Sequence, residues 1–140
     1  MRYLAIDPGD RRTGLAIGDD VMRMATPLEV ITTTGDAARL EAIERIVARE
    51  QPDAIVIGLP LHADGSESVS SRKARELARA METRLGITVH LYDERLTSFE
   101  ADQRMSGTGL THGQKKARRD ALAAAAILED FLRARGQTDE

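Results

Sequence analysis

Apolar and polar positions alternate through the first quarter of the chain in a way typical of short strands. The pattern predicts strands over residues 2–6, 13–17 and 27–33, because each run is rich in apolar and β-branched residues and ends at turn-forming residues. Residues 7–12 form the first turn. Such short connections favour antiparallel neighbours, so the chain is predicted to begin with a three-stranded meander.

The pattern then changes to helices that alternate with two more strands. Apolar residues recur at helical spacing from Asp36 to Pro52, and again from about residue 66 to 85. Each of these helices precedes a strand, at residues 54–57 and 87–92. The run 54–57 is apolar throughout, which is typical of a strand buried on both faces. The last predicted elements are a short helix over 97–105, a glycine-containing loop over 106–113 and a long helix over 114–135.

This order of elements, β-β-β-α-β-α-β-α, predicts an α/β fold with a five-stranded mixed sheet flanked by helices. The last two strands are expected to be reached by right-handed crossovers. We expect one domain over residues 1–135, followed by a tail at 136–140 that frays.

Composition narrows the class of protein. Charged residues make up 31% and hydrophobic residues 41% of the 140 positions, as in globular rather than disordered chains. The chain has no cysteine, which excludes a disulfide framework and thiolate-bound zinc. No apolar stretch reaches the roughly 18 residues of a membrane span, and the N-terminus lacks a signal-peptide pattern. We expect a cytoplasmic protein without a membrane partner.

Charge is unevenly distributed along the chain. Residues 1–70 hold 7 basic and 12 acidic residues, whereas residues 71–140 hold 13 and 11. Two basic runs in the second half could hold a polyanionic backbone, or could simply be solvated helix faces. These runs contain Arg72, Lys73 and Arg75, and then Lys115, Lys116, Arg118 and Arg119.

Three acids stand where chemistry is expected. Asp7 follows the first strand, and the pair Asp93 and Glu94 follows the last. Polar chemistry gathers at the carboxyl ends of parallel strands. Asp120 lies on the apolar stripe of the final helix, where an unpaired carboxylate is costly, so it needs an arginine or a metal. Convergence of Asp7, Glu94 and Asp120 would suit Mg²⁺ or Mn²⁺ and the cleavage of phosphodiesters.

Each of these residues also has a purely structural interpretation. Asp7 could be a turn acid, Asp93 or Glu94 a helix cap, and Asp120 an ion-pair partner of an arginine, namely Arg12 or Arg95. The same holds for the glycines, which could let backbone approach a phosphate or only shape turns. The glycines concerned are Gly9, Gly14, Gly58 and Gly65.

Four motifs in order carry a resemblance to a known family. They are Asp7-x-Gly9-x-x-Arg12-x-Gly14, Gly58-Leu59-Pro60 with Asp64-Gly65, Asp93-Glu94-Arg95-Leu96-Thr97-Ser98, and Lys116-x-x-x-Asp120-x-x-Ala123-Ala124. With these motifs the chain resembles, over about residues 2–132, the YqgF or RuvX family. Its members are Holliday junction resolvase-like proteins, now usually described as ribosomal RNA precursor nucleases.

The resemblance implies a ribonuclease H-like fold with strand order 3-2-1-4-5. It also implies a Mg²⁺- or Mn²⁺-dependent nuclease acting on the 5′ end of pre-16S ribosomal RNA in a bacterial cytoplasm, as a monomer or weak homodimer, with the ribosomal particle as a further partner. Carried over, Asp7, Glu94 and Asp120 form the carboxylate set, with Arg12 and Arg95 as its close basic partners.

Three alternatives stay open from the sequence. The first is a Holliday junction resolvase acting on branched DNA. The second is a non-catalytic nucleic-acid-binding module in which the acids only stabilise the fold. The third is a nucleotide-binding domain, because residues 7–14 also resemble the phosphate loop of sugar kinases and actin-like ATPases, which enclose a nucleotide between two such domains.

Overall fold

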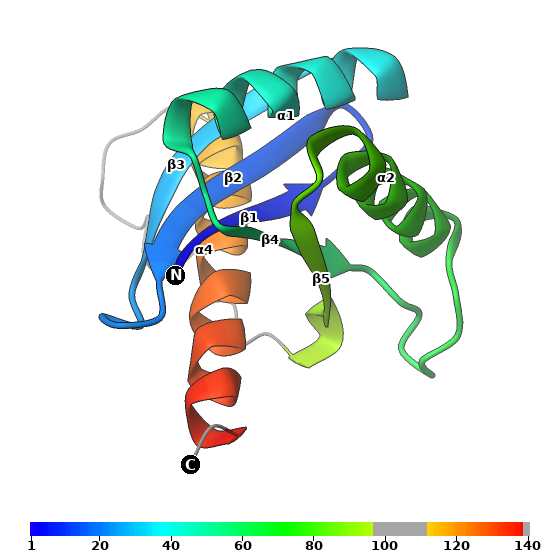
Figure 1. Ribbon diagram of the computed structural model, residues 1–140. Helices are drawn as coiled ribbons and strands as arrows, with labels where there is room; N and C mark the ends of the chain where they lie inside the picture. Colours follow the sequence, from blue (N-terminus) through cyan, green and yellow to red (C-terminus); the bar gives the residue numbers. More distant parts are fainter. Residues whose placement is uncertain (97–111, 139–140) are drawn as a thin grey trace.

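A computed structural model of the chain describes residues 1–96 and 112–138. Five strands form one mixed sheet in the order β3-β2-β1-β4-β5, with helices on both faces (Figure 1). This is the predicted architecture. The predicted helix over 97–105 and residues 106–111 of the predicted loop lie outside the described residues.

The first three strands form the predicted antiparallel meander. They are β1 (Arg2–Pro8), β2 (Arg12–Asp19) and β3 (Ala25–Thr32). The next strand, β4 (Ala54–Leu59), is buried at every position and pairs in parallel with β1, while β5 (Thr88–Asp93) pairs in parallel with β4. The carboxyl ends of β1, β4 and β5 therefore meet at one edge of the sheet.

The helices begin and end at recognisable signals. The helix α1 (Asp36–Glu50) ends where Gln51 adopts a left-handed conformation. The helix α2 (Val69–Leu85) begins at a capping box between Ser68 and Ser71 and ends at Gly86. A single 3₁₀ turn, η1 (Glu94–Leu96), directly follows β5, and α4 (His112–Thr138) completes the fold.

The final helix ends later than the sequence predicted. It was expected to end at Arg135, with a frayed tail from Gly136, but α4 continues to Thr138. Gly136 is buried, and a Cβ atom there would overlap the guanidinium of Arg23 from the loop between β2 and β3. Packing against that side chain supports the last turn of the helix.

Two separate cores cover the two faces of the sheet. On one face, α1 and α2 pack on Leu4, Ile6 and equivalent residues of the neighbouring strands. On the other face, α4 packs on Tyr3, Ala5 and Val56 through Ala124, Ala125, Ile127, Leu128, Phe131 and Leu132. Side chains alternate between faces along a strand, so β1 directs its odd-numbered residues towards α4. Among the described residues, no helix is both long and apolar enough to span a membrane.

Candidate active site

Asp7 lies at the end of β1 on the face that α4 covers. Tyr3 and Ala5 belong to the core beneath α4, and Asp7 continues the same alternation. In the pairing of β1 with β2, Asp7 lies opposite Gly14. The alternation of a short buried strand therefore places this carboxyl group between the sheet edge and the final helix.

Asp120 reaches the same region because Gly14 has no side chain. A Cβ atom on Gly14 would overlap the backbone carbonyl oxygen of Asp120 and would lie 3.1 Å from the backbone nitrogen of Ala121. The backbone of α4 therefore rests directly on β2, at the residue that pairs with Asp7. This close approach is a clear physical reason for a glycine at position 14.

Glu94 directly follows β5 and lies on the face of the sheet that α4 covers. His90 and Tyr92 contact the ring of Phe131 on α4, with ring centroids 5.2 and 6.3 Å apart. A Cβ atom on Gly58 would overlap Oε1 of Glu94 and would lie 2.8 Å from Cδ1 of Ile127 on α4. Gly58 therefore leaves the space between β4 and α4 in which the Glu94 carboxyl group lies.

The carboxyl groups of Asp7 and Glu94 interact strongly. Burial raises the pKa of Glu94 to about 9, helped by a hydrogen bond with Asp7 and by the negative charges of Asp7 and Asp93. Glu94 therefore carries a proton at neutral pH. Its Oε1 atom is buried and accepts no hydrogen bond from the described residues. Two acids held so closely favour either a shared proton or a bound cation.

The adjacent acid, Asp93, has a different partner. Its Oδ2 atom lies 2.6 Å from Nη2 of Arg95, and its Oδ1 atom accepts a hydrogen bond from the Arg95 backbone at 3.0 Å. This arginine holds the pKa of Asp93 below its ordinary range. Of the two adjacent acids, Glu94 is thus the one that accompanies Asp7.

The expectation that Arg95 pairs with the carboxylate set is wrong. Besides binding Asp93, its Nη1 atom donates to the carbonyl oxygen of Ala63 at 3.3 Å and lies close to Gly65, whose φ is +88°. Arg95 therefore ties η1 to the loop after β4. Gly65 shapes this loop, and the space over it is filled by the guanidinium of Arg95.

Asp120 pairs with Arg12, one of the two arginines suggested by the structural interpretation. Nε of Arg12 lies 3.0 Å from Oδ2 of Asp120. Among the residues that the structure describes, no three His, Asp or Glu side chains are grouped closely enough to hold one ion. The predicted convergence of three carboxylates is therefore only partly present. A partly buried carboxylate needs a compensating charge, and Arg12 supplies one for Asp120.

A cleft of about 600 Å³ opens beside this ion pair. Its lining consists of the turn between β1 and β2, the end of β3 and Asp120. The turn is tight, because the backbone nitrogen of Gly9 donates to the carbonyl oxygen of Arg12 at 2.9 Å. Arg11, which the sequence analysis did not single out, is exposed in this cleft; the run Asp10-Arg11-Arg12 was the signal for it.

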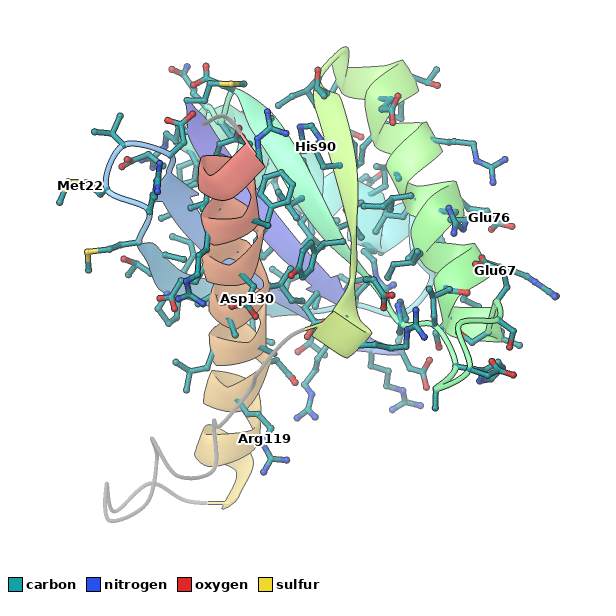
Figure 2. All side chains as sticks on the ribbon, turned by 90° about the horizontal axis from the view of Figure 1, so that it is seen from below. Met22, Glu67, Glu76, His90, Arg119 and Asp130 are labelled. Atoms are coloured by element: carbon teal, nitrogen blue, oxygen red, sulfur yellow. The ribbon has the colours of Figure 1, made fainter. Side chains whose placement is uncertain are left out.

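The predicted basic runs come from helices on opposite faces of the sheet. On α2, Arg75 forms two hydrogen bonds with Glu67, at 2.7 and 3.0 Å, and Lys73 lines a groove between α1 and α2, while Arg72 is exposed. On α4, Arg119 is exposed, and Figure 2 shows it well away from Glu67. The side chains of Lys115, Lys116 and Arg118 lie outside the described part of the chain, although their backbone belongs to α4.

Arg39 is a further residue that the sequence patterns did not indicate. This residue is buried on α1, and its Nη2 atom donates to the carbonyl oxygens of Gly9 and Asp10. The signal was its spacing, because Arg39 lies four residues before Ile43 on the buried stripe of the helix.

Curated relatives match nearly the whole chain. A protein of Thiobacillus denitrificans (strain ATCC 25259 / T1) is 47% identical over 133 residues, covering 94% of this chain and 91% of that protein. A protein of Anaeromyxobacter sp. (strain Fw109-5) is 42% identical over 132 residues, covering 94% and 96%. Both carry the name "Putative pre-16S rRNA nuclease".

Solved structures share the fold at lower identity. RuvC of T. thermophilus, in complex with a Holliday junction substrate, is 20% identical with a TM-score of 0.59, covering 99% of this chain and 97% of that one. The Fowlpox virus resolvase, with substrate Holliday junction DNA, is 10% identical with a TM-score of 0.60, covering 96% and 98%. The strand order and these neighbours confirm the predicted ribonuclease H-like fold.

A family model described as "RuvX: Holliday junction resolvase" matches residues 1–134. This match and the relatives above 40% identity agree with the family that the four motifs indicated. The chain belongs to the RuvX family.

Proposed function

We propose that this chain is a divalent-metal-dependent endonuclease that cleaves ribosomal RNA precursor in the cytoplasm. The observation that carries the proposal is the close pair of carboxyl groups, Asp7 and the largely buried Glu94, beside the Arg12–Asp120 ion pair. A purely structural role does not account for Glu94, whose pKa is raised by burial and by the second carboxyl group beside it. The names of the relatives supply the ribosomal RNA precursor as the substrate.

The residues at this edge fit a hard divalent cation. Oε1 of Glu94 is buried without a hydrogen-bond donor among the described residues, and the facing Asp7 offers a second carboxylate. Oxygen ligands without thiolates suit Mg²⁺ or Mn²⁺. Asp7 and Glu94 would hold the ion. Asp120 would join them if Arg12 left its ion pair with Asp120 to bind a phosphate group of the substrate. When bound, such an ion stabilises the charge that develops on a phosphoryl oxygen.

The chain's own residues would prepare this site in three ways. Glu94 would give up its proton on binding a cation, because the positive charge of the cation would then offset the two carboxylates. Gly14 and Gly58 keep the backbone of Asp120 and the Glu94 carboxyl group close to the sheet. Arg12 would bind phosphate, which holds the substrate without selecting its bases.

The path of the nucleic acid is proposed to start at the cleft beside Asp120. Arg11 and Arg12 line this cleft, and Arg119 is exposed on the covering helix. We place Lys115, Lys116 and Arg118 on the same path because they share that helix. Arg72, Lys73, Arg75 and Arg95 would be secondary contacts, since Arg75 is bound to Glu67 and Arg95 to Asp93.

The test is cleavage of an RNA that spans the 5′ end of a 16S precursor, with Mg²⁺ or Mn²⁺. Asp7→Asn and Glu94→Gln are expected to reduce cleavage at least a hundredfold. Glu41→Gln makes the same chemical change at an exposed position on α1 and should cleave like the wild type. Equal cleavage by wild type and Asp7→Asn would contradict the proposal.

Branched DNA is the second candidate substrate. The description of the matching family and the junction complexes among the fold neighbours favour it. A four-way DNA junction added to the RNA assay separates the two candidates. If RNA is the substrate, excess junction leaves RNA cleavage largely intact and is itself not cut. Cutting of the junction in preference to RNA would reassign the enzyme to branched DNA.

A further inference from the structure

We propose that Arg39 is a positioning residue for this site. Its buried guanidinium holds the turn between β1 and β2 in the conformation that presents Arg12 to Asp120 and to the cleft. The inference rests on the proposed function, and it concerns a residue on the opposite face of the sheet from α4.

The contacts of Arg39 are concentrated on that turn. Nη2 donates to the carbonyl oxygens of Gly9 and Asp10, the latter at 2.8 Å. These two residues lie between Asp7 and Arg12. Two backbone hydrogen bonds complete the attachment, from Gly9 to Arg12 and from Thr33 to the carbonyl oxygen of Arg11, both at 2.9 Å. Arg39 thus connects the first turn of α1 to the segment that separates the acid from its arginine.

The location of Arg39 is unfavourable for a residue that only stabilises the fold. Its exposed fraction is 8%, and its Nε atom is buried without a hydrogen-bond partner among the described residues. Among the described residues, no carboxylate forms an ion pair with Arg39. It also lies in the first turn of α1, where the helix dipole disfavours a cation. An apolar side chain would join Leu40 and Ile43 in the core at lower cost.

Loss of Arg39 would therefore affect the turn more than the strands. Asp7 stays fixed by its pairing with Gly14 and by α4. Arg12, in contrast, depends on the turn for its approach to Asp120 and to a bound phosphate. We expect substrate binding to weaken and KM to rise more than kcat falls. A small displacement of a positioned group can lower kcat/KM by about tenfold or more.

The direct test is amide hydrogen exchange in Arg39→Met, measured by NMR without metal or nucleic acid. Exchange at Gly9 should become at least several-fold faster while the β1 core amides keep their protection. Arg45→Met is the matched control, because Arg45 is exposed on the same helix. Unchanged protection at Gly9 in folded Arg39→Met would overturn the inference. If that variant does not fold, Arg39→Lys, which keeps the charge but loses the planar fork, takes its place under the same criterion.

A second readout ties Arg39 to Arg12. Arg39→Met and Arg12→Met are each expected to lower kcat/KM, and the double variant should be little worse than Arg12→Met alone. Fully multiplicative losses would show that Arg39 acts independently of Arg12 and would overturn the inference. Absence of cleavage by the wild-type protein would count against the proposed function alone, because the exchange experiment needs no activity.

Discussion

The backbone carbonyl oxygen of Asp120 rests on Gly14, at the point where any Cβ atom would overlap it. Gly14 is the β2 partner of Asp7, so one glycine sets the distance between the final helix and β2 directly beside the first acid. The site therefore depends on a close contact between two backbones, in addition to its charged side chains.

Replacement of this glycine should damage both stability and activity. Gly14→Ala is expected to lower the free energy of unfolding by about 2–3 kcal/mol, because neither backbone can yield without moving α4. Cleavage by the folded fraction should fall as well. Urea denaturation and an RNA cleavage assay measure the two effects. Gly86→Ala is the control: its left-handed φ of +64° brings strain but no overlap, so cleavage should persist. Wild-type stability of Gly14→Ala would contradict this account of the contact.

The buried Glu94 makes stability depend on pH in a defined direction. The pKa of Glu94 is about 9 in the folded chain and near 4.5 when unfolded, so between these values the folded state binds more protons. Stability should therefore fall as pH rises through this window. Glu94→Gln removes the effect and should exceed the wild type by on the order of 1–3 kcal/mol at pH 9, with little difference below pH 4.5.

Urea denaturation in EDTA from pH 4.5 to 9 measures that difference. Glu41→Gln should follow the wild type throughout, since Glu41 is exposed. A wild type and Glu94→Gln that respond identically to pH would show that Glu94 is not held protonated.

Metal binding should be coupled to the same proton. Because the cation replaces the proton on Glu94, the affinity for Mn²⁺ is expected to rise with pH by up to about tenfold per unit below pH 9. Calorimetry in buffers of different ionisation enthalpy measures the protons released. Release close to one proton in the wild type, and none in Glu94→Gln, is the expected result. Binding without proton release in the wild type would place the metal elsewhere.

The Arg12–Asp120 pair should matter more for binding nucleic acid than for stability. The two side chains are 32% and 28% exposed, and ion pairs near the surface contribute about 1 kcal/mol or less. Arg12→Met should therefore change the unfolding free energy little, while the slope of log K against log salt for RNA binding falls by about 1. Arg49→Met, which breaks the surface ion pairs of Arg49 with Glu29 and Glu50, is the control. An unchanged salt slope in Arg12→Met would show that Arg12 does not contact phosphate.

The sequence was most informative where alternation or spacing decides the outcome. Strand alternation predicted the sheet, and it explains why Glu94 rather than Asp93 lies with Asp7. Sequence patterns do not show which of several arginines reaches an acid. Arg95 binds Asp93, Arg12 competes for Asp120, and Arg39 turns inward to two backbone carbonyls. The choices of Arg12 and Arg39 depend on side-chain reach between elements that lie far apart in the chain, and that of Arg95 on the local fold of the turn after β5.

The proposed cleavage reaction depends on a divalent ion held by Asp7 and Glu94. A crystal structure of the protein soaked in Mn²⁺, with anomalous scattering recorded at the manganese edge, tests it most directly. An anomalous peak is expected within coordination distance of carboxylate oxygens of both Asp7 and Glu94. A protein that cleaves RNA with Mn²⁺ but shows no manganese at these two residues would contradict it.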